Sequence, residues 1–275
     1  MKPFFSIVIP TLNEEKFLPR LLSDLVKQKE KDFEVIVTDS FSKDKTRDCI
    51  KFYKKTLSLD FIRTRQKNVG SQRNYGAKRA TGDYLVFLDA DTRINASFLK
   101  RVKKTIAKKK GLLFLPYLLP DKEYKQYKPL FDLLNILVEL SQNLPKRFSL
   151  GGSIVIERNF FNIIGGFDDK LFIAEDHELV QRAGLWGVDS KFIKEAGTFF
   201  SLRRMRKEGQ INFFYKYFVA SARRLLFNEE IKKKIFEYQM GGQSYLENGE
   251  GHKKEEFFHH YFNQIKGLFK KILAT

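Results

Sequence analysis

The sequence predicts an α/β protein with a mostly parallel central sheet flanked by helices, followed by a helical carboxy-terminal extension. Short apolar runs, typical of buried strands, alternate with stretches whose apolar residues recur at helical spacing. Polar loops follow the first of these runs, as expected for parallel strands joined by right-handed crossovers. Hydrophobic residues make up 43% of the 275-residue chain, which is ample for a core.

The amino-terminal part predicts three strands and a first helix. Ser6–Pro10 forms the first strand, and Lys16–Lys27 follows as a helix because its apolar residues recur at helical spacing. Phe33–Asp39 is a second strand that ends in a carboxylate. Leu59–Thr64 is a third, shorter strand.

The central stretch Asn68–Asp91 joins a polar segment containing Gly70 and Gly76 to a buried strand that ends in Asp89 and Asp91. Side chains alternate along a strand, so these two carboxylates would share a face if the extended backbone persisted. Paired oxygens suit a hard cation such as Mg²⁺ or Mn²⁺, with phosphate supplying further ligands. An acidic turn that closes the strand is the alternative.

The rest of the first two hundred residues continues to alternate helices and strands. The expected elements are a basic helix over Asn95–Lys110, a strand over Gly111–Pro120, a helix over Pro129–Leu144, a strand over Gly151–Ile156, a short helix over Asn159–Ile164, a helix that opens near Glu175 and Asp176, and a strand over Val188–Lys194. Acidic residues at the start of a helix are favoured by the helix dipole, so capping alone would also explain that pair.

Four polar residues stand at or just beyond the ends of predicted strands: Thr11, Asp39, Asp89 and Asp91. In open parallel sheets, ligands bind beyond the carboxyl ends of the strands. We therefore expect these side chains to converge at one edge of the sheet and to form a ligand site there.

The formal net charge of +18 predicts an anionic partner, for which nucleic acid, anionic lipid and phosphate-bearing substrates are all candidates. The single cysteine, Cys49, excludes an internal disulfide framework and fits a reducing compartment. No stretch offers about 18 uninterrupted apolar residues, so no spanning helix is expected. The first residues are too short an apolar run for a signal peptide.

The carboxy-terminal part has a different character. Ile211–Phe227 is rich in aromatic and aliphatic residues, and Phe257–Leu273 places apolar residues at helical spacing opposite lysines. This profile is typical of an interfacial membrane helix. A terminal helix packed on the protein's own core is an equal alternative.

Four motifs, met in order, resemble glycosyltransferase family 2, whose members have the GT-A fold. They are Ser6–Glu15, close to the family's opening; Val37–Thr46, which resembles its second motif; Asn68–Asp91, which resembles the RNxG…GDYxxFLDAD segment; and Gly165–Asp168 with Glu175-Asp176 and Arg182, which resembles the acceptor-side segment. The resemblance implies a glycosyltransferase domain over residues 1–206, with a nucleotide-sugar half of about 1–95 and an acceptor half of about 96–206. Residues 207–275 would form a helical, membrane-associating extension.

The resemblance also implies roles for individual residues. Thr11 and Asp39 would contact the nucleotide base, and Asp89 would hold the ribose side. Asp91, together with Asp89, would hold the divalent metal that bridges the diphosphate. The catalytic base would be Asp176, supported by Glu175. The other donor-binding positions that it implies are Pro10, Asn13, Glu14, Arg73, Ala90, Arg203 and Arg204.

The chain departs from the family pattern at three places. The segment around Gly70 is shorter than the commonest versions. Phe41 stands where the second motif usually has glycine. No histidine near Phe200 and Ser201 matches the late metal ligand of some relatives. The third metal ligand, and the choice between Mn²⁺ and Mg²⁺, therefore stay open.

The resemblance implies an inverting, metal-dependent transfer of sugar from a nucleoside diphosphate sugar, favoured to be a UDP-sugar, to a hydroxyl acceptor. The positive charge and aromatic carboxy terminus favour a glycan or lipid-linked acceptor and a peripheral position on the cytoplasmic face of an anionic membrane. A polyprenyl-phosphate sugar synthase is the alternative, and oligomeric state stays open.

Two other functions fit less well. A sugar nucleotidyltransferase should show a glycine-rich loop, which Pro10–Glu15 does not resemble. Nucleic-acid binding is not predicted, because it leaves the carboxylates at three strand ends unexplained.

Overall fold

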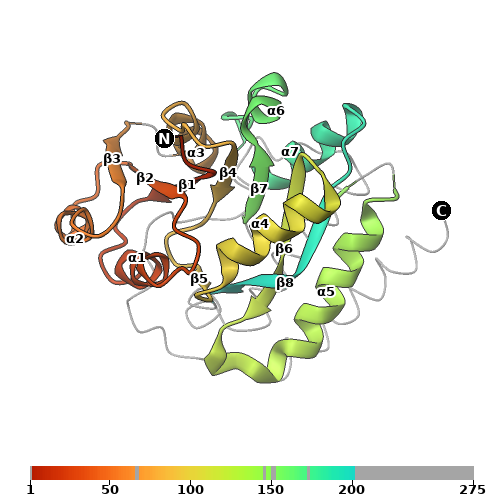
Figure 1. Cartoon of the computed structure of the whole chain (residues 1–275), viewed down its shortest axis with the longest axis horizontal. Coiled ribbons are helices and arrows are strands. Elements are labelled where there is room, and N and C mark those ends of the chain that lie inside the picture. Colours follow the sequence, from red (N-terminus) through yellow and green to blue (C-terminus); the bar gives the residue numbers. More distant parts are fainter. Residues whose placement is uncertain (1, 66–67, 145–146, 150–152, 172–173, 202–275) are drawn as a thin grey trace, which may run out of the picture.

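The computed structural model describes residues 2–65, 68–144, 147–149, 153–171 and 174–201. Within them, eight strands form one mixed sheet in the order β3-β2-β1-β4-β7-β6-β8-β5, and helices flank it (Figure 1). The strands are β1 (Phe5–Thr11), β2 (Phe33–Asp39), β3 (Leu59–Arg63), β4 (Tyr84–Phe87), β5 (Arg93–Ile94), β6 (Leu113–Pro120), β7 (Ile154–Glu157) and β8 (Lys191–Phe200). The helices are α1 (Leu18–Val26), α2 (Thr46–Tyr53), α3 (Val69–Ala77), α4 (Phe98–Lys109), the 3₁₀ segment η1 (Lys122–Tyr127), α5 (Lys128–Ser141), α6 (Arg158–Ile163) and α7 (Glu175–Leu185).

Parallel pairing dominates the amino-terminal half of the sheet. Strand β1 pairs in parallel with β2 on one side and β4 on the other, and β2 pairs in parallel with β3. Beyond β4 the sheet is mixed, because β7 runs antiparallel between β4 and β6. The α/β prediction is confirmed, and the register sets Thr11 directly beside Asp39 at the carboxyl ends of β1 and β2.

Two apolar layers bury the sheet. In β1, Ile7 and Ile9 face the layer that includes α1 and α4, whereas Val8 faces the layer that includes α6 and α7. This alternation is what a strand covered by helices on both faces requires. The core therefore fixes the central strands, and their carboxyl ends are held in place by it.

Helix α3 was not predicted, because its sequence is polar and contains two glycines. The Asn68 side chain caps its amino terminus by accepting a hydrogen bond from the Ser71 amide at 3.2 Å. Gly76 lets the helix approach β1 closely, since a Cβ at that position would lie 2.5 Å from Val8 Cγ1. Close packing on the sheet therefore helps to hold α3 in place, although the helix lacks the apolar stripe by which sequence patterns detect helices.

The extended backbone ends sooner after β4 than a common face for Asp89 and Asp91 would need. The strand stops at Phe87, and a turn follows in which the Thr92 amide donates to the Asp89 carbonyl oxygen at 3.0 Å. The two carboxylates therefore lie on a turn rather than on one strand face. The short β5 that follows was not predicted.

The expected extension over 207–275, and the candidate residues Arg203 and Arg204, lie outside the described residues. Among the helices that the structure does describe, none combines the length and the apolar content that crossing a bilayer requires.

Candidate active site

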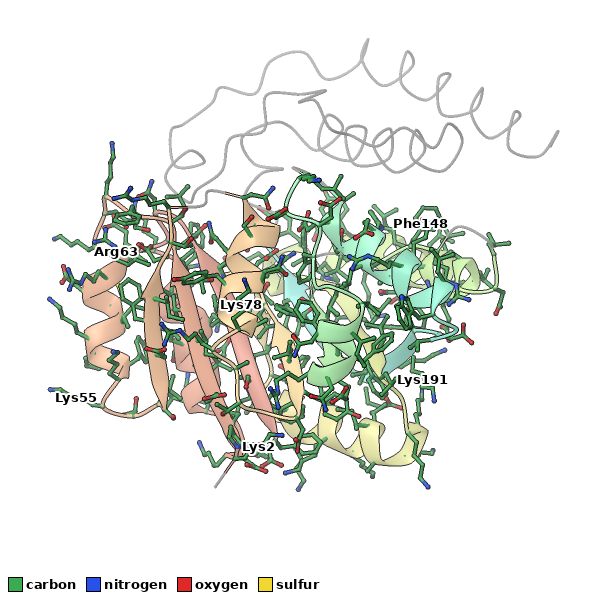
Figure 2. The ribbon with its side chains drawn as sticks, turned by 90° about the horizontal axis from the view of Figure 1, so that it is seen from above. Lys2, Lys55, Arg63, Lys78, Phe148 and Lys191 are labelled. Atoms are coloured by element: carbon green, nitrogen blue, oxygen red, sulfur yellow. The ribbon has the colours of Figure 1, made fainter. Side chains whose placement is uncertain are left out.

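The polar strand ends converge at one edge of the sheet, as predicted. Figure 2 shows Arg63, at the end of β3, and Phe148 toward the same edge, opposite Lys2 at the start of the chain. Two groups of polar side chains occupy this edge. We name them the Asp39 cluster, made of Thr11, Asp39, Ser42 and Arg63, and the Arg73 cluster, made of Arg73, Asp89, Glu175 and Asp176.

The Asp39 cluster is built around a buried carboxylate at the end of β2. Asp39 is only 2% exposed and accepts hydrogen bonds from the Thr11 hydroxyl at 3.3 Å and the Ser42 amide at 3.0 Å. The Ser42 hydroxyl also donates to it. The Arg63 guanidinium lies 3.7 Å from the same carboxylate and adds an ion pair. A carboxylate is an acceptor-only group, so a ligand that contacts Asp39 must present a donor, such as N–H, in place of one of these four partners.

Phe41 closes this cluster on its outer side. Its backbone has a φ of 57°, in the left-handed region that a non-glycine residue adopts at some cost. Its ring lies 4.2 Å from the Arg63 guanidinium carbon, a cation–π contact. The substitution for the family's usual glycine therefore keeps the glycine-like backbone and adds an exposed aromatic surface beside Asp39.

The loop after β1 completes this end of the site. Pro10 is the penultimate residue of β1, and Asn13 has a φ of 55°. The Asn13 side chain accepts from the Lys43 amide at 2.8 Å, which ties the β1 loop to the β2 loop. Buried Glu14 donates its amide to the Thr46 hydroxyl at 2.9 Å. The predicted base-side residues are thus brought together.

The Arg73 cluster joins distant parts of the chain through one buried guanidinium. Arg73 on α3 is 1% exposed. It donates to Asp89 at 2.7 Å and to Glu175 at 2.6 Å, and so links the turn after β4 to the start of α7. Its guanidinium also lies 5.2 Å from the Phe167 ring. Burial opposes its charged form, but the carboxylates of Asp89, Glu175 and Asp176 outweigh burial and raise its pKa further above the ordinary arginine value.

The start of α7 presents Glu175 and Asp176 in its first turn, where the helix dipole favours negative charge. Ala174 precedes them with a φ of 63°. Asp176 is 9% exposed and accepts a hydrogen bond from the Ser149 hydroxyl at 2.7 Å. The Ser149 amide in turn donates to His177 Nδ1 at 3.0 Å.

Their surroundings push the pKa values of the two adjacent carboxyls in opposite directions. Burial raises the pKa of Glu175, and the nearby charge of Asp176 adds to this, while Arg73 opposes it. Burial also acts to raise the pKa of Asp176, but His177, the Ser149 hydroxyl and Arg73 together lower it below the usual value. Asp176 is therefore ionised at neutral pH. Paired groups with divergent pKa values are typical of sites that carry out acid–base chemistry.

The turn after β4 holds the candidate metal ligands. Ala90 is buried, whereas the Asp89 side chain is 38% exposed and Asp91 is half-buried. No group of three or more histidine, cysteine or acidic side chains with metal-ligating geometry occurs among the described residues. Two carboxylates on an accessible turn nevertheless fit Mg²⁺ or Mn²⁺, because such ions take one or two carboxylates and complete their shell with substrate phosphates and water.

Sequence patterns missed four residues of the site. Ser42 and Arg63 contact Asp39, and Ser149 and His177 contact Asp176 or each other. Ser42 lies within the second motif, so its position was a usable signal. His177 directly follows the predicted Glu175-Asp176 pair, so its position was a usable signal as well. Arg63 and Ser149 carry no motif of their own, and only the tertiary structure brings them to the site.

Chemically, this edge combines an acceptor-only group at one end, an accessible pair of carboxylates in the middle and an ionised carboxylate at the other end. The first can orient an N–H-bearing ring, and the second can hold a cation with its phosphate ligands. The third can take a proton from an attacking hydroxyl.

Known proteins share this sequence pattern and fold. The model of glycosyl transferase family 2 matches residues 6–164. Poly(ribitol-phosphate) beta-N-acetylglucosaminyltransferase TarS of Staphylococcus aureus is 37% identical over 100 residues, 35% of this chain and 18% of that protein. A PGL/p-HBAD biosynthesis glycosyltransferase of Mycobacterium bovis is 30% identical over 179 residues, 63% of this chain and 67% of that protein.

Solved structures have a similar fold. The S. aureus TarS 1–349 complex with UDP-GlcNAc aligns with a TM-score of 0.59 and 24% identity, covering 73% of this chain and 58% of that one. The mannosyltransferase PcManGT of Pyrobaculum calidifontis, in complex with GDP-Man and Mn²⁺, aligns with a TM-score of 0.62 and 20% identity, covering 80% and 65%. With the family match extending from β1 to α6, the chain belongs to glycosyl transferase family 2.

Proposed function

We propose that this glycosyltransferase is inverting and metal-dependent, and that it moves a sugar from a UDP-sugar to a hydroxyl on a lipid-linked or membrane-proximal acceptor. The observation that carries the proposal is the buried Arg73 bridge between Asp89 and Glu175. This bridge fixes the position of the turn that carries Asp89 relative to the start of α7, which carries Glu175. Donor and acceptor groups would therefore meet in a defined geometry, which transfer between two bound substrates requires.

The Asp39 cluster supports a nucleotide base with an N–H donor. Asp39 offers acceptors only, and uracil and guanine both carry ring N–H groups. A UDP-sugar is favoured because the relative TarS has been solved with UDP-GlcNAc, whereas the neighbour solved with GDP-Man is less similar in sequence. Thr11 and the β1 loop would border the base, as Pro10, Asn13 and Glu14 lie there.

Transfer would begin at Asp176. As the acceptor oxygen attacks the anomeric carbon, its proton passes to the Asp176 carboxylate, a new carbon–oxygen bond forms, and the bond to the diphosphate breaks. The diphosphate leaves with the electron pair of that bond. General-base help of this kind contributes roughly 10²–10⁴-fold to the rate. Glu175 and Arg73 hold the start of α7 so that Asp176 keeps its position.

A divalent metal bound by Asp91 and Asp89 would stabilise the negative charge that grows on the leaving diphosphate. For Asp89 this requires that its second oxygen be turned toward the ligand, because its Oδ1 accepts from Arg73. The 38% exposure of the Asp89 side chain leaves room for this.

The ionised Asp176 favours a hydroxyl acceptor over a phosphate acceptor. A polyprenyl phosphate is already an anion and needs no base, whereas a hydroxyl must lose its proton as it attacks. A phosphate acceptor would make no use of the surroundings that lower the pKa of Asp176, which are the nearby charges of His177 and Arg73 and the hydrogen bond from Ser149. The +18 charge supports an acceptor presented at an anionic membrane.

The proposal is tested by incubating the protein with UDP-, GDP- and dTDP-sugars in the presence of Mn²⁺ or Mg²⁺. Release of the nucleoside diphosphate measures turnover of each donor. We expect one UDP-sugar to be hydrolysed or transferred, and Asp91→Ala to abolish the reaction. Equal turnover in the presence of a chelator would disprove metal dependence. Turnover of GDP-sugars alone would overturn the assignment of the base.

A further inference from the structure

Helix α5 carries apolar residues on two opposite faces. Its inner face packs on β6: Phe131 and Val138 are buried, and the Asn135 side chain bonds both the amide and the carbonyl oxygen of Leu118 at 2.9 and 2.8 Å. Its outer face is a row of aliphatic side chains that are 48–58% exposed, here named the α5 stripe: Leu133, Ile136, Leu137, Leu140 and, just beyond the helix, Leu144. These positions recur at helical spacing and form one narrow arc.

We expect another surface to cover this exposed row, because a helix that is apolar on both faces normally packs on both. Among the described residues, helix α5 lies on the side opposite α2 (Figure 1). A single exposed helix suits insertion into a flat interface.

A second exposed apolar element lies near Arg147, which follows α5 in the chain. Leu185 and Trp186, at the carboxyl end of α7, are 85% and 58% exposed. Arg147 ties this end of α7 to the end of α5: it ion-pairs with Asp189 at 2.8 Å and donates to the Val188 carbonyl oxygen at 3.2 Å. Tryptophan combines an apolar body with a polar N–H group and prefers membrane interfaces.

The charges beside the stripe are compatible with an anionic surface. Asp132 and Glu139 flank it, and each is paired with a lysine, Asp132 with Lys128 at 2.5 Å and Glu139 with Lys194 at 2.9 Å. The carboxylates at the border are thus neutralised locally. The net charge of +18 on the whole chain adds long-range attraction to anionic lipid.

Hydrogen bonds connect the end of α5 to the candidate base. The Phe148 amide donates to the Ser141 hydroxyl at 3.1 Å, and Gln142 donates to the Phe148 carbonyl oxygen at 2.9 Å. The next residue, Ser149, donates its hydroxyl to Asp176 at 2.7 Å. A surface bound by α5 would therefore lie close to the acceptor side of the site.

We infer that the α5 stripe, with Leu185 and Trp186, docks this enzyme on an anionic lipid bilayer and so brings Asp176 to an acceptor held in that bilayer. The docking surface itself stands on the exposure and the charges of α5 and α7. Its link to the acceptor rests on the proposed function.

The experiment uses the full chain and vesicles of phosphatidylcholine with about 25% phosphatidylglycerol, a charge density that attracts basic protein surfaces. Trp186 is the only tryptophan in the sequence, so its emission reports on this surface alone. We expect vesicles to shift the emission to shorter wavelength, and lipids brominated on their acyl chains to quench it.

Two matched double variants test whether vesicle binding depends on the α5 stripe or on exposed apolar side chains in general. Leu137→Gln/Leu140→Gln should lower the vesicle-bound fraction by about tenfold or more, because two half-exposed leucines lose their insertion. The control Phe52→Gln/Ile163→Gln changes two side chains that are 70% and 61% exposed on α2 and α6, and should bind as the unchanged protein does.

For the unchanged protein, either a lack of vesicle binding or binding without a change in Trp186 emission would overturn the inference. For the stripe variant, either vesicle binding equal to that of the unchanged protein or a changed oligomeric state without lipid would overturn it. Equal binding would assign membrane attachment to another surface of the chain, and a changed oligomeric state would assign the stripe to a second copy of the chain. Donor hydrolysis in lipid-free solution, measured on the same preparations, reports separately on the proposed function.

Discussion

The Asp39 cluster and the Arg73 cluster lie at the same edge of the sheet but are held together in different ways. Asp39 is fixed by neighbours from two strand ends and their loops, and its cation, Arg63, is 40% exposed. Arg73 is 1% exposed and bridges carboxylates 16 and 102 residues away in the chain. The first cluster therefore pairs its buried carboxylate with an exposed cation, whereas the second is centred on a buried cation.

The largest expected effect tests that difference directly. Arg73→Met should destabilise the protein by about 3–5 kcal/mol, because it leaves Glu175 and Asp89 without their buried cation. Arg63→Met should cost less than about 1 kcal/mol, since the Arg63 side chain is 40% exposed and solvent screens its 3.7 Å ion pair with Asp39. Urea unfolding of both variants measures the two values. Equal losses would show that the clusters do not differ in the way described.

The Asp39 cluster should respond in ligand binding more than in stability. Asp39→Asn places an amide N–H among hydroxyl and amide donors and should cost about 1–3 kcal/mol of folding free energy. Donor affinity should fall as well, because the acceptor for the base N–H is lost. Calorimetric titration with UDP-sugar checks the second effect. Unchanged affinity in a folded variant would remove Asp39 from the donor site.

A smaller, pH-dependent effect is expected from Ser149→Ala. The Ser149 hydroxyl helps to lower the pKa of Asp176 from 3.8, so Asp176 contributes stability above that pH, and the contribution is lost as pH falls through its folded-state pKa. Without the hydroxyl, the variant should be about 1 kcal/mol less stable at pH 7. The difference should shrink below pH 3.8. Unfolding at several pH values measures it, and a pH-independent difference would assign Ser149 a packing role only.

The smallest effect concerns Phe41. Phe41→Gly relieves a left-handed backbone, which costs a non-glycine residue about 1–2 kcal/mol, but it loses the ring's contact with Arg63 and adds freedom to the unfolded chain. We expect a net change in stability within about 1 kcal/mol. Thermal unfolding is sufficient to measure it. A larger loss would show that the ring, and not the backbone, decides the conformation of this loop.

The difference between the two clusters also explains which parts of the fold and the site could be predicted from the sequence. Strand ends are local features, so Thr11, Asp39 and Asp89 could be placed at one edge from apolar runs and the polar residues after them. The parallel half of the sheet follows from alternating strands and helices, and its observed register sets Thr11 beside Asp39.

What could not be predicted depends on contacts between distant segments. Helix α3 lacks an apolar stripe and is held by the Asn68 cap and the close approach at Gly76. The burial of Arg73 and the contact of Ser149 with Asp176 depend on how α3, α5 and α7 pack. No local pattern encodes these distances, and the family resemblance supplied the residue types without their partners.

In the proposed function, donor binding and proton removal belong to different ends of one site. Donor binding and transfer, measured on the same preparations of Asp91→Ala and Asp176→Asn, separate the two. We expect Asp91→Ala to lose metal-dependent donor binding, whereas Asp176→Asn should bind donor as the unchanged protein does but transfer about 10²–10⁴-fold more slowly. Loss of donor binding in Asp176→Asn, or full transfer by it, would show that Asp176 is not the catalytic base.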